Sequence, residues 1–198
     1  MSYQFVDGKG PRWLGDELPN LPPELAHAAS LPPKVTPKYV FFFGYEGPEP
    51  ECCLQQWYPS PCTSPSGEKF HTSEQYMMYR KAQLMKDTST AEKILEAKTP
   101  AEAKRLGREV KGFDQKVWDE NCEAVVEEGN FLKFEQNREL GEVLLGAGER
   151  RLVETSPNDR VWGVGFNSEE AEGREEEWGK NLLGKALERV RERLRERK

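Results

Sequence analysis

The sequence predicts a mainly helical fold, in which a compact multi-helical domain with two or three short β-strands follows a proline-rich arm. Three observations support this prediction. Apolar residues recur at helical spacing in several segments after residue 72, start signals precede these segments, and only short runs have the composition of strands. The chain has 198 residues with 9 Phe, 6 Tyr and 5 Trp, which is enough to form the core of one domain.

Prolines are concentrated in residues 1–38, where the apolar residues follow no sustained period. We therefore expect 1–38 to form a weakly ordered N-terminal extension with a short helical turn at 24–29. The domain is expected to span 39–198. It begins with the run at 39–43, whose β-branched and aromatic residues predict a buried strand that ends at Gly44.

Start and stop signals divide the remainder of the domain into helices. A clear example is Thr99 followed by Pro100, which places an N-cap residue before a proline at the first helical position. Trp118, Cys122 and Val125 recur at steps of four and three, which is typical of one face of a helix. The predicted helices cover 72–85, 88–97, 99–107, 114–134, 136–145 and 179–195, with a short strand at 151–154.

Charge and cysteine content exclude several classes of protein. The formal net charge of -6 disfavours duplex nucleic acid as a partner, because phosphate neutralisation needs a basic surface. No run of about 18 apolar residues and no secretory signal pattern is present, so we expect a protein of the cytoplasm or nucleus that is neither secreted nor membrane-bound. The 4 Cys and 2 His fit no zinc-binding spacing, and we expect reduced thiols and no metal.

Glu74 and Lys81 are the first candidates for chemistry. They are seven residues apart on a predicted helix, so their side chains project from one face at a separation of about 10 Å along the axis. Apolar neighbours such as Met77 and Met78 would raise the pKa of the carboxyl and lower the pKa of the amine, which suits proton transfer. The alternative interpretation is that Glu74 stabilises a helix N-terminus and Lys81 is a solvated surface residue.

Two glycine-containing segments are the next candidates. In the loop 157–165, Trp162 beside Gly163 could stack a planar base, although a Trp packed at a turn explains the same pattern. Residues 179–186 superficially match a phosphate-binding loop. We reject that interpretation because Ala186 replaces the required hydroxyl residue and an acidic segment, rather than a buried strand, precedes it. Lys180 and Asn181 could still meet an anion or a ribose, or form a solvated helix start.

Six sequence blocks occur in a defined order. They are LQQWYP at 54–59, TSEQYMMYRKA at 72–82, AEAKRLGR at 101–108, Trp118, NDRVWG at 158–163 and GKNLLG at 179–184. Together these blocks, over residues 39–196, resemble the NADAR family of the YbiA-like superfamily. The chain departs from the family pattern in having Gln55-Gln56 where Ser-Asn is usual, and Val164 where many bacterial members have an acid.

The resemblance implies a mainly helical fold and an N-glycosidase. Members of the family cleave the bond between ribose C1 and an amino-pyrimidine in riboflavin-pathway intermediates, or remove ADP-ribose from guanine. The resemblance assigns the catalytic acid and lysine to Glu74 and Lys81. The expected substrate-binding residues are Trp57, Tyr58, Trp118, Asp159, Arg160, Trp162, Gly163, Lys180 and Asn181.

The chemistry of C–N bond cleavage is consistent with these residue types. Glu74 could stabilise an oxocarbenium-like centre or activate water, and Lys81 could protonate the leaving base or form a Schiff base with the sugar. Lys180, Arg160 or Arg80 could hold a phosphate. The expected partner is a small ribosylated or ADP-ribose-like molecule, and the reaction requires no cofactor. The alternatives are a non-catalytic sensor of NAD or ADP-ribose, and a helical scaffold protein.

Overall fold

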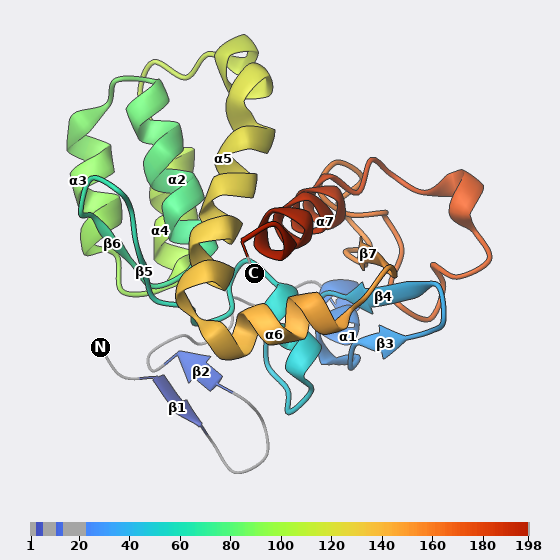
Figure 1. The fold of residues 1–198 in the computed structure, drawn as a ribbon. Coiled ribbons are helices and arrows are strands. Elements are labelled where there is room, and N and C mark those ends of the chain that lie inside the picture. The colour runs from blue at the N-terminus through green and yellow to red at the C-terminus, as the bar shows by residue number, and fades with distance from the viewer. Residues whose placement is uncertain (1–2, 6–10, 14–22, 198) are drawn as a thin grey trace.

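The protein was analysed as a computed structural model that describes residues 3–5, 11–13 and 23–197. The fold of these residues is mainly helical (Figure 1), as the sequence predicts. The α-helices are α1 (Pro23–Ser30), α2 (Ser73–Leu84), α3 (Thr88–Glu96), α4 (Pro100–Arg108), α5 (Gln115–Gln136), α6 (Arg138–Gly146) and α7 (Leu182–Arg195), with short 3-10 helices η1 (Pro50–Leu54) and η2 (Glu175–Glu177).

The predicted helix starts are confirmed by their caps. The Thr72 hydroxyl accepts a hydrogen bond from the Gln75 N–H at 3.1 Å, and the Thr99 hydroxyl accepts one from the Glu102 N–H at the same distance. Each cap satisfies an N–H group that has no partner within its own helix. These caps fix where α2 and α4 begin, and therefore which of their residues face each other.

Seven short strands occur in the described residues, more than the two or three expected. They are β1 (Tyr3–Phe5), β2 (Pro11–Trp13), β3 (Lys34–Val35), β4 (Tyr39–Phe42), β5 (Cys62–Thr63), β6 (Lys69–Phe70) and β7 (Arg151–Glu154). The expected strands are β4 and β7, which pair in parallel so that residue 42 lies beside Glu154. β3 pairs antiparallel with β4 and completes this sheet. β3 precedes residue 39 in the sequence, where the domain is expected to begin.

Two large hydrophobic clusters and a smaller third one form the core. One large cluster joins α2, α3 and α4 to one face of α5, and the other joins β4, β7, α6 and α7 to a different face of α5. Figure 1 shows these two halves side by side, with α5 spanning both. Met77 on α2 packs against both clusters. The residues of α2 therefore lie where the halves meet.

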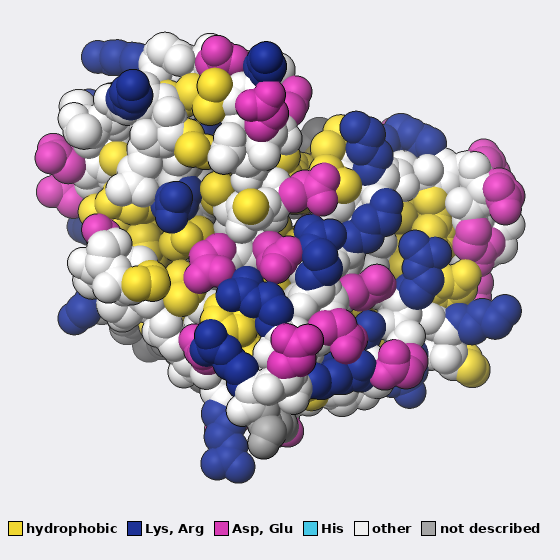
Figure 2. All heavy atoms as spheres, turned by 45° about the horizontal axis from the view of Figure 1, so that its top comes forward, with side chains coloured by type: hydrophobic (Ala, Val, Ile, Leu, Met, Phe, Trp, Pro, Cys, Tyr) yellow, Lys and Arg dark blue, Asp and Glu magenta, His cyan; other side chains and the backbone are white. Residues whose placement is uncertain are grey.

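The surface between α5 and α7 carries charges of both signs. Arg189 Nε lies 2.6 Å from a Glu127 carboxylate oxygen, and Arg193 Nη1 lies 3.1 Å from a Glu128 oxygen. Figure 2 shows Lys and Arg side chains interspersed with Asp and Glu side chains over one face of the molecule. Exposed pairs of this kind add little stability, so the packing of α7 depends on its apolar face. Within the described residues, none of the helices combines the length and apolar character that a bilayer span requires.

Candidate active site

Glu74 lies in the first turn of α2 at the junction of the two halves. Its side chain is buried, with 6% of its surface exposed, and it is hydrogen-bonded to the Trp57 side chain. Burial raises the pKa of this carboxyl. Lys104, the Trp57 hydrogen bond, Arg108 and Lys81 act in the opposite direction and favour its charged form. Glu74 is therefore a buried carboxyl surrounded by cations, which is unlike a solvated residue at a helix start.

Lys81 lies two turns further along α2. Its Nζ donates a hydrogen bond to the Gly107 carbonyl at 2.8 Å and lies 4.5 Å from the centre of the Phe113 ring and 5.9 Å from that of the Trp118 ring. Burial lowers the pKa of the Lys81 amine, although the Glu74 carboxylate partly offsets this effect. An amine with a lowered pKa, held among aromatic rings, can act as a nucleophile or transfer a proton near neutral pH.

Two cations of α4 complete the surroundings of Glu74. Lys104 and Arg108 are one helical turn apart, so both project toward the same side, and both act on the Glu74 carboxyl. The Lys104 Nζ lies 5.6 Å from the centre of the Trp57 ring. Neither cation has an ion-pair partner among the described residues. Sequence analysis did not single them out, although their spacing of four residues in the block 101–108 is a signal that could have identified them.

A second buried carboxyl, Glu154, lies at the end of β7. Its side chain is 7% exposed, and one of its oxygens accepts a hydrogen bond from Gln55 Nε2 at 3.3 Å. Burial raises the pKa of Glu154 to about 7, and the nearby Asp159 and Glu74 act in the same direction. Lys104 acts on both carboxyls, so they share one electrostatic environment. The sequence contains only a strand signal at Glu154, which is why this residue was missed.

The loop 157–165 approaches the site through Asp159. One Asp159 oxygen accepts hydrogen bonds from the N–H groups of Val161 and Trp162, both at 2.8 Å. Trp162 is half-buried and packs against the cluster that contains β7 and α7. The Arg160 guanidinium is exposed and donates to the Glu177 carbonyl. The structure thus brings Asp159 close to Glu154 and engages Arg160 with the backbone of η2.

Asn181 precedes α7 in a left-handed conformation with φ of 51°, which asparagine tolerates well. Its Oδ1 accepts a hydrogen bond from the Glu154 N–H at 3.0 Å, and its Nδ2 donates to the Leu152 carbonyl at 2.8 Å. The backbone N–H of Asn181 donates to the Gly163 carbonyl at 3.3 Å, whereas the Lys180 side chain is exposed. The Asn181 side chain therefore positions the backbone on which Glu154 is placed.

Tyr58 and Arg80, which the sequence also offered as site residues, contact residues other than Glu74 and Lys81. Tyr58 is half-buried, and its ring centre lies 5.9 Å from the buried Lys133 amine. That amine donates to the Gln55 carbonyl at 2.8 Å. The Arg80 guanidinium lies 6.0 Å from the centre of the Tyr76 ring and donates to the Tyr76 hydroxyl at 3.3 Å. Arg80 is thus engaged within α2 and does not act on Glu74.

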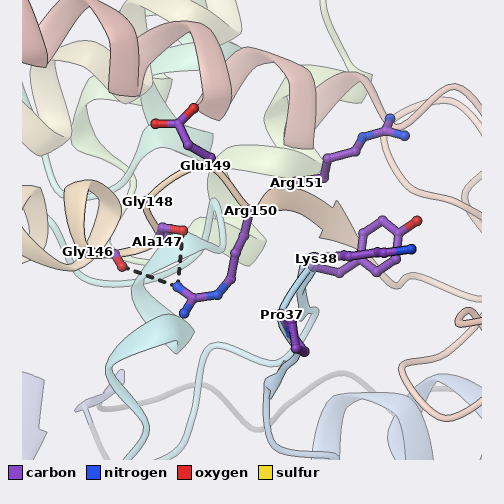
Figure 3. Close-up of a pocket in the computed structure, with 9 residues that line it drawn as sticks. Pro37, Lys38, Gly146, Ala147, Gly148, Glu149, Arg150 and Arg151 are labelled. Carbon is purple, nitrogen blue, oxygen red and sulfur yellow. Dashed lines mark hydrogen bonds between the residues drawn. The ribbon is translucent and has the colours of Figure 1, made fainter.

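A cavity of about 660 Å³ lies where β4 and β7 begin, at the end of this strand pair that is opposite to Glu154. It is lined by residues 37–39 and 146–151, and in Figure 3 the Arg150 guanidinium is bonded to the carbonyls of Gly146 and Ala147. None of the residues predicted to act in catalysis lines it.

In the part of the chain that the structure describes, no group of three or more His, Cys, Asp and Glu side chains is arranged to hold a metal ion.

Comparison with known proteins identifies the family and supports the fold. The NADAR domain model matches residues 41–195, and the chain belongs to the NADAR family. The N-glycosidase R617 of Acanthamoeba polyphaga mimivirus is 41% identical over 164 residues, which cover 79% of this chain and 96% of the relative. Protein irg-1 of Caenorhabditis elegans is 34% identical over 172 residues, covering 78% of this chain and 80% of the relative.

Bacterial relatives extend the same agreement. The N-glycosidase YbiA of Escherichia coli strain K12 is 34% identical over 128 residues, which cover 65% of this chain and 72% of the relative. The NMR structure of the Escherichia coli protein YbiA superimposes with a TM-score of 0.66 and 28% identity, covering 86% of this chain and 92% of that chain. The protein is accordingly an N-glycosyl hydrolase of YbiA-like fold, as its sequence motifs predict.

Proposed function

We propose that this N-glycosidase hydrolyses the ribose C1–N bond of a phosphorylated ribosyl compound. The base is an amino-pyrimidine of the kind found early in riboflavin synthesis, or a guanine that carries ADP-ribose. The observation that carries this proposal is the placement of Glu74 and Lys81 on one side of α2. Both are at least partly withdrawn from solvent, and the charge of each shifts the pKa of the other toward its charged form. Such a pair has the two groups that C–N cleavage needs, a carboxylate for the sugar cation and an amine of lowered pKa.

Two routes are open to these residues. In the direct route, the Glu74 carboxylate stabilises the sugar cation and takes a proton from the attacking water, while an acid protonates the leaving nitrogen. In the second route, a sugar linked to an exocyclic nitrogen ring-opens to an imine. The Lys81 amine adds to C1, the base leaves as its free amine, and water then hydrolyses the Lys81 imine to release the sugar.

Aromatic side chains around the pair are proposed to hold the base. Trp57 is hydrogen-bonded to Glu74, and the Trp118 and Phe113 rings lie near the Lys81 amine. Flat rings beside the reacting groups can stack a pyrimidine or purine. We assign the phosphate of the substrate to Lys104 and Arg108, because these cations of α4 act directly on Glu74.

The test replaces Glu74 by Gln, which keeps the shape of the side chain and removes its charge. We expect kcat for release of ribose phosphate or ADP-ribose to fall at least about 100-fold, because Gln can neither stabilise a cation nor accept a proton. The substrates are a phosphoribosylamino-pyrimidine and ADP-ribosylated guanosine. Glu92→Gln, on the exposed face of α3, is the matched control and should keep wild-type turnover.

Unchanged turnover in Glu74→Gln would remove this carboxyl from the mechanism. If wild-type protein binds ADP-ribose tightly but releases no base from either substrate, the sensor interpretation replaces the proposed substrates. Borohydride added during turnover separates the two routes, because it reduces a Lys81 imine to a stable adduct that mass spectrometry can locate. Lys81→Met cannot form this adduct and serves as its control.

A further inference from the structure

The geometry points to Glu154 as the acid that protonates the leaving base, working with Glu74 as a pair of carboxyls with different protonation states. This inference rests on the proposed function, since it assigns the proton donor for the same bond cleavage. The second route, through the Lys81 imine, uses Lys81 as the nucleophile, so a separate group must supply the proton to the leaving nitrogen. The direct route also needs an acid beside the carboxylate that receives the water proton.

The hydrogen bonds of Glu154 fit a neutral acid. Its Oε1 accepts from Gln55 Nε2, whereas its Oε2 is buried and has no hydrogen-bond partner among the described residues. A buried carboxylate oxygen without a donor is costly, and such atoms in folded proteins call for an explanation. In the protonated form, Oε1 is the carbonyl oxygen that Gln55 satisfies and Oε2 carries the proton. The O–H then has no acceptor among the described residues and is free to donate to a substrate atom brought next to it.

The charged groups around Glu154 favour the same state. Asp159, in the loop after β7, and Glu74, on α2, both oppose a negative charge on Glu154, while Lys104 on α4 favours it. Burial raises the pKa of both carboxyls of the pair. Glu74, however, has Lys104 and two further cations near it as well as a hydrogen bond with Trp57. These contacts compensate a negative charge on Glu74 better than one on Glu154, and we accordingly place the proton on Glu154 and the charge on Glu74.

Fixed backbone contacts hold Glu154 in this place. The Asn181 side chain binds the Glu154 N–H and the Leu152 carbonyl on β7, and the Gln55 amide also donates to the Phe43 carbonyl at 2.8 Å. The polar side chains that contact Glu154 thus come from Gln55, directly after η1, and Asn181, directly before α7, and neither donates to Oε2. A side chain that only stabilised the fold would be expected to use both oxygens.

The proposed step balances as follows. The C1–N bond breaks, its electron pair goes to the nitrogen, and that nitrogen takes the proton from Glu154 Oε2. Water forms a bond to C1 and loses a proton to the Glu74 carboxylate. The products are the free base and the sugar with a C1 hydroxyl, while Glu154 is left ionised and Glu74 protonated. Proton exchange with solvent restores both carboxyls, so the net reaction consumes one water.

The test compares Glu154→Gln with wild type on two leaving groups that share the same ribose phosphate. The amino-pyrimidine must be protonated to leave, whereas a pyridinium base leaves as a neutral molecule and needs no proton. We expect kcat on the amino-pyrimidine to fall at least about 100-fold in Glu154→Gln, with much less effect on the pyridinium compound. In wild type, kcat on the amino-pyrimidine should decline as pH rises through about 7, and this decline should be absent from the variant.

Stability provides a second measurement. Burial raises the pKa of Glu154 in the folded protein from 4.5 to about 7. The contribution of Glu154 to the free energy of unfolding is therefore fully present below the pKa of the unfolded state, and it is lost as pH rises through about 7. Glu154→Gln lacks this loss, so at pH 8 its Tm should equal or exceed that of wild type. Glu92→Gln is the control and should retain both wild-type pH profiles.

The inference is overturned if Glu154→Gln keeps wild-type turnover on the amino-pyrimidine, if it slows both substrates equally, or if its Tm at pH 8 falls below that of wild type. Each of these results leaves the proposed function intact as long as wild-type protein is active. Wild-type protein that releases neither base overturns the proposed function, and the role of Glu154 as its acid is then overturned with it.

Discussion

At the scale of single residues, substrate selection depends on where the free cations lie. Sequence analysis offered Lys180, Arg160 and Arg80 for the phosphate. Arg160 donates to the Glu177 carbonyl of η2, Arg80 donates to the Tyr76 hydroxyl of its own helix, and Lys180 is exposed before α7. The cations that act on Glu74 are instead Lys81 of α2 and the two cations of α4. A phosphate beside the reacting ribose would therefore meet Lys104 and Arg108.

We predict that Lys104→Ala and Arg108→Ala each raise KM for the phosphorylated substrate about 10-fold or more, because each removes a charged hydrogen bond to phosphate. KM for the dephosphorylated nucleoside should change much less. Steady-state kinetics on the two substrates measure this difference. Lys93→Ala, on the exposed face of α3, is the control and should leave both KM values unchanged. Equal changes for both substrates would contradict phosphate binding by these residues.

At the scale of elements, the position of Glu154 depends on how closely α7 approaches β7. A Cβ atom placed on Gly184 of α7 would lie 1.9 Å from the Leu152 carbonyl oxygen of β7. No side chain can be accommodated there unless the backbone moves, because the obstructing atom belongs to the strand itself. Gly184 thus permits the contact that lets Asn181 bind the β7 backbone next to Glu154.

We predict that Gly184→Ala lowers the free energy of unfolding by about 3 kcal/mol or more, as measured by urea denaturation, because the added methyl group forces α7 away from β7. Gly146→Ala is the matched control. Nothing lies within 4 Å of a Cβ at Gly146, so its substitution should leave stability unchanged or slightly increased. A Gly184→Ala variant as stable as wild type would show that α7 adjusts without cost.

At the scale of the whole molecule, the candidate site forms where two hydrophobic clusters meet. Glu74 and Lys81 come from the half that contains α2, α3 and α4, and Glu154 comes from the half that contains the sheet and α7. Cys53 belongs to one of these clusters and Cys62 to the other, and Cys52 and Cys122 are also buried. All 4 are free thiols, and their exposed fractions range from 1% at Cys52 to 8% at Cys122.

We predict that these thiols report on global unfolding. Burial raises the pKa of Cys52 to about 12 and that of Cys62 to about 11, so neither forms a reactive thiolate at pH 8. A thiol reagent should therefore label folded protein very slowly and should label all 4 cysteines in guanidinium chloride. Rapid labelling of folded protein would mean that a cluster opens locally without global unfolding.

The sequence by itself determined the helices, the two central strands and the family, and it indicated Glu74 and Lys81 as a candidate pair. These features are local, since capping residues, periodicity and a spacing of seven residues on one helix can be recognised within a short segment. Only the tertiary structure decided which cations surround Glu74 and that a second buried carboxyl lies beside it. Gln55 and its partner Glu154 are 99 residues apart in the chain. Their contact, and the burial that raises the pKa of Glu154, arise from packing between distant segments, which no short sequence pattern encodes.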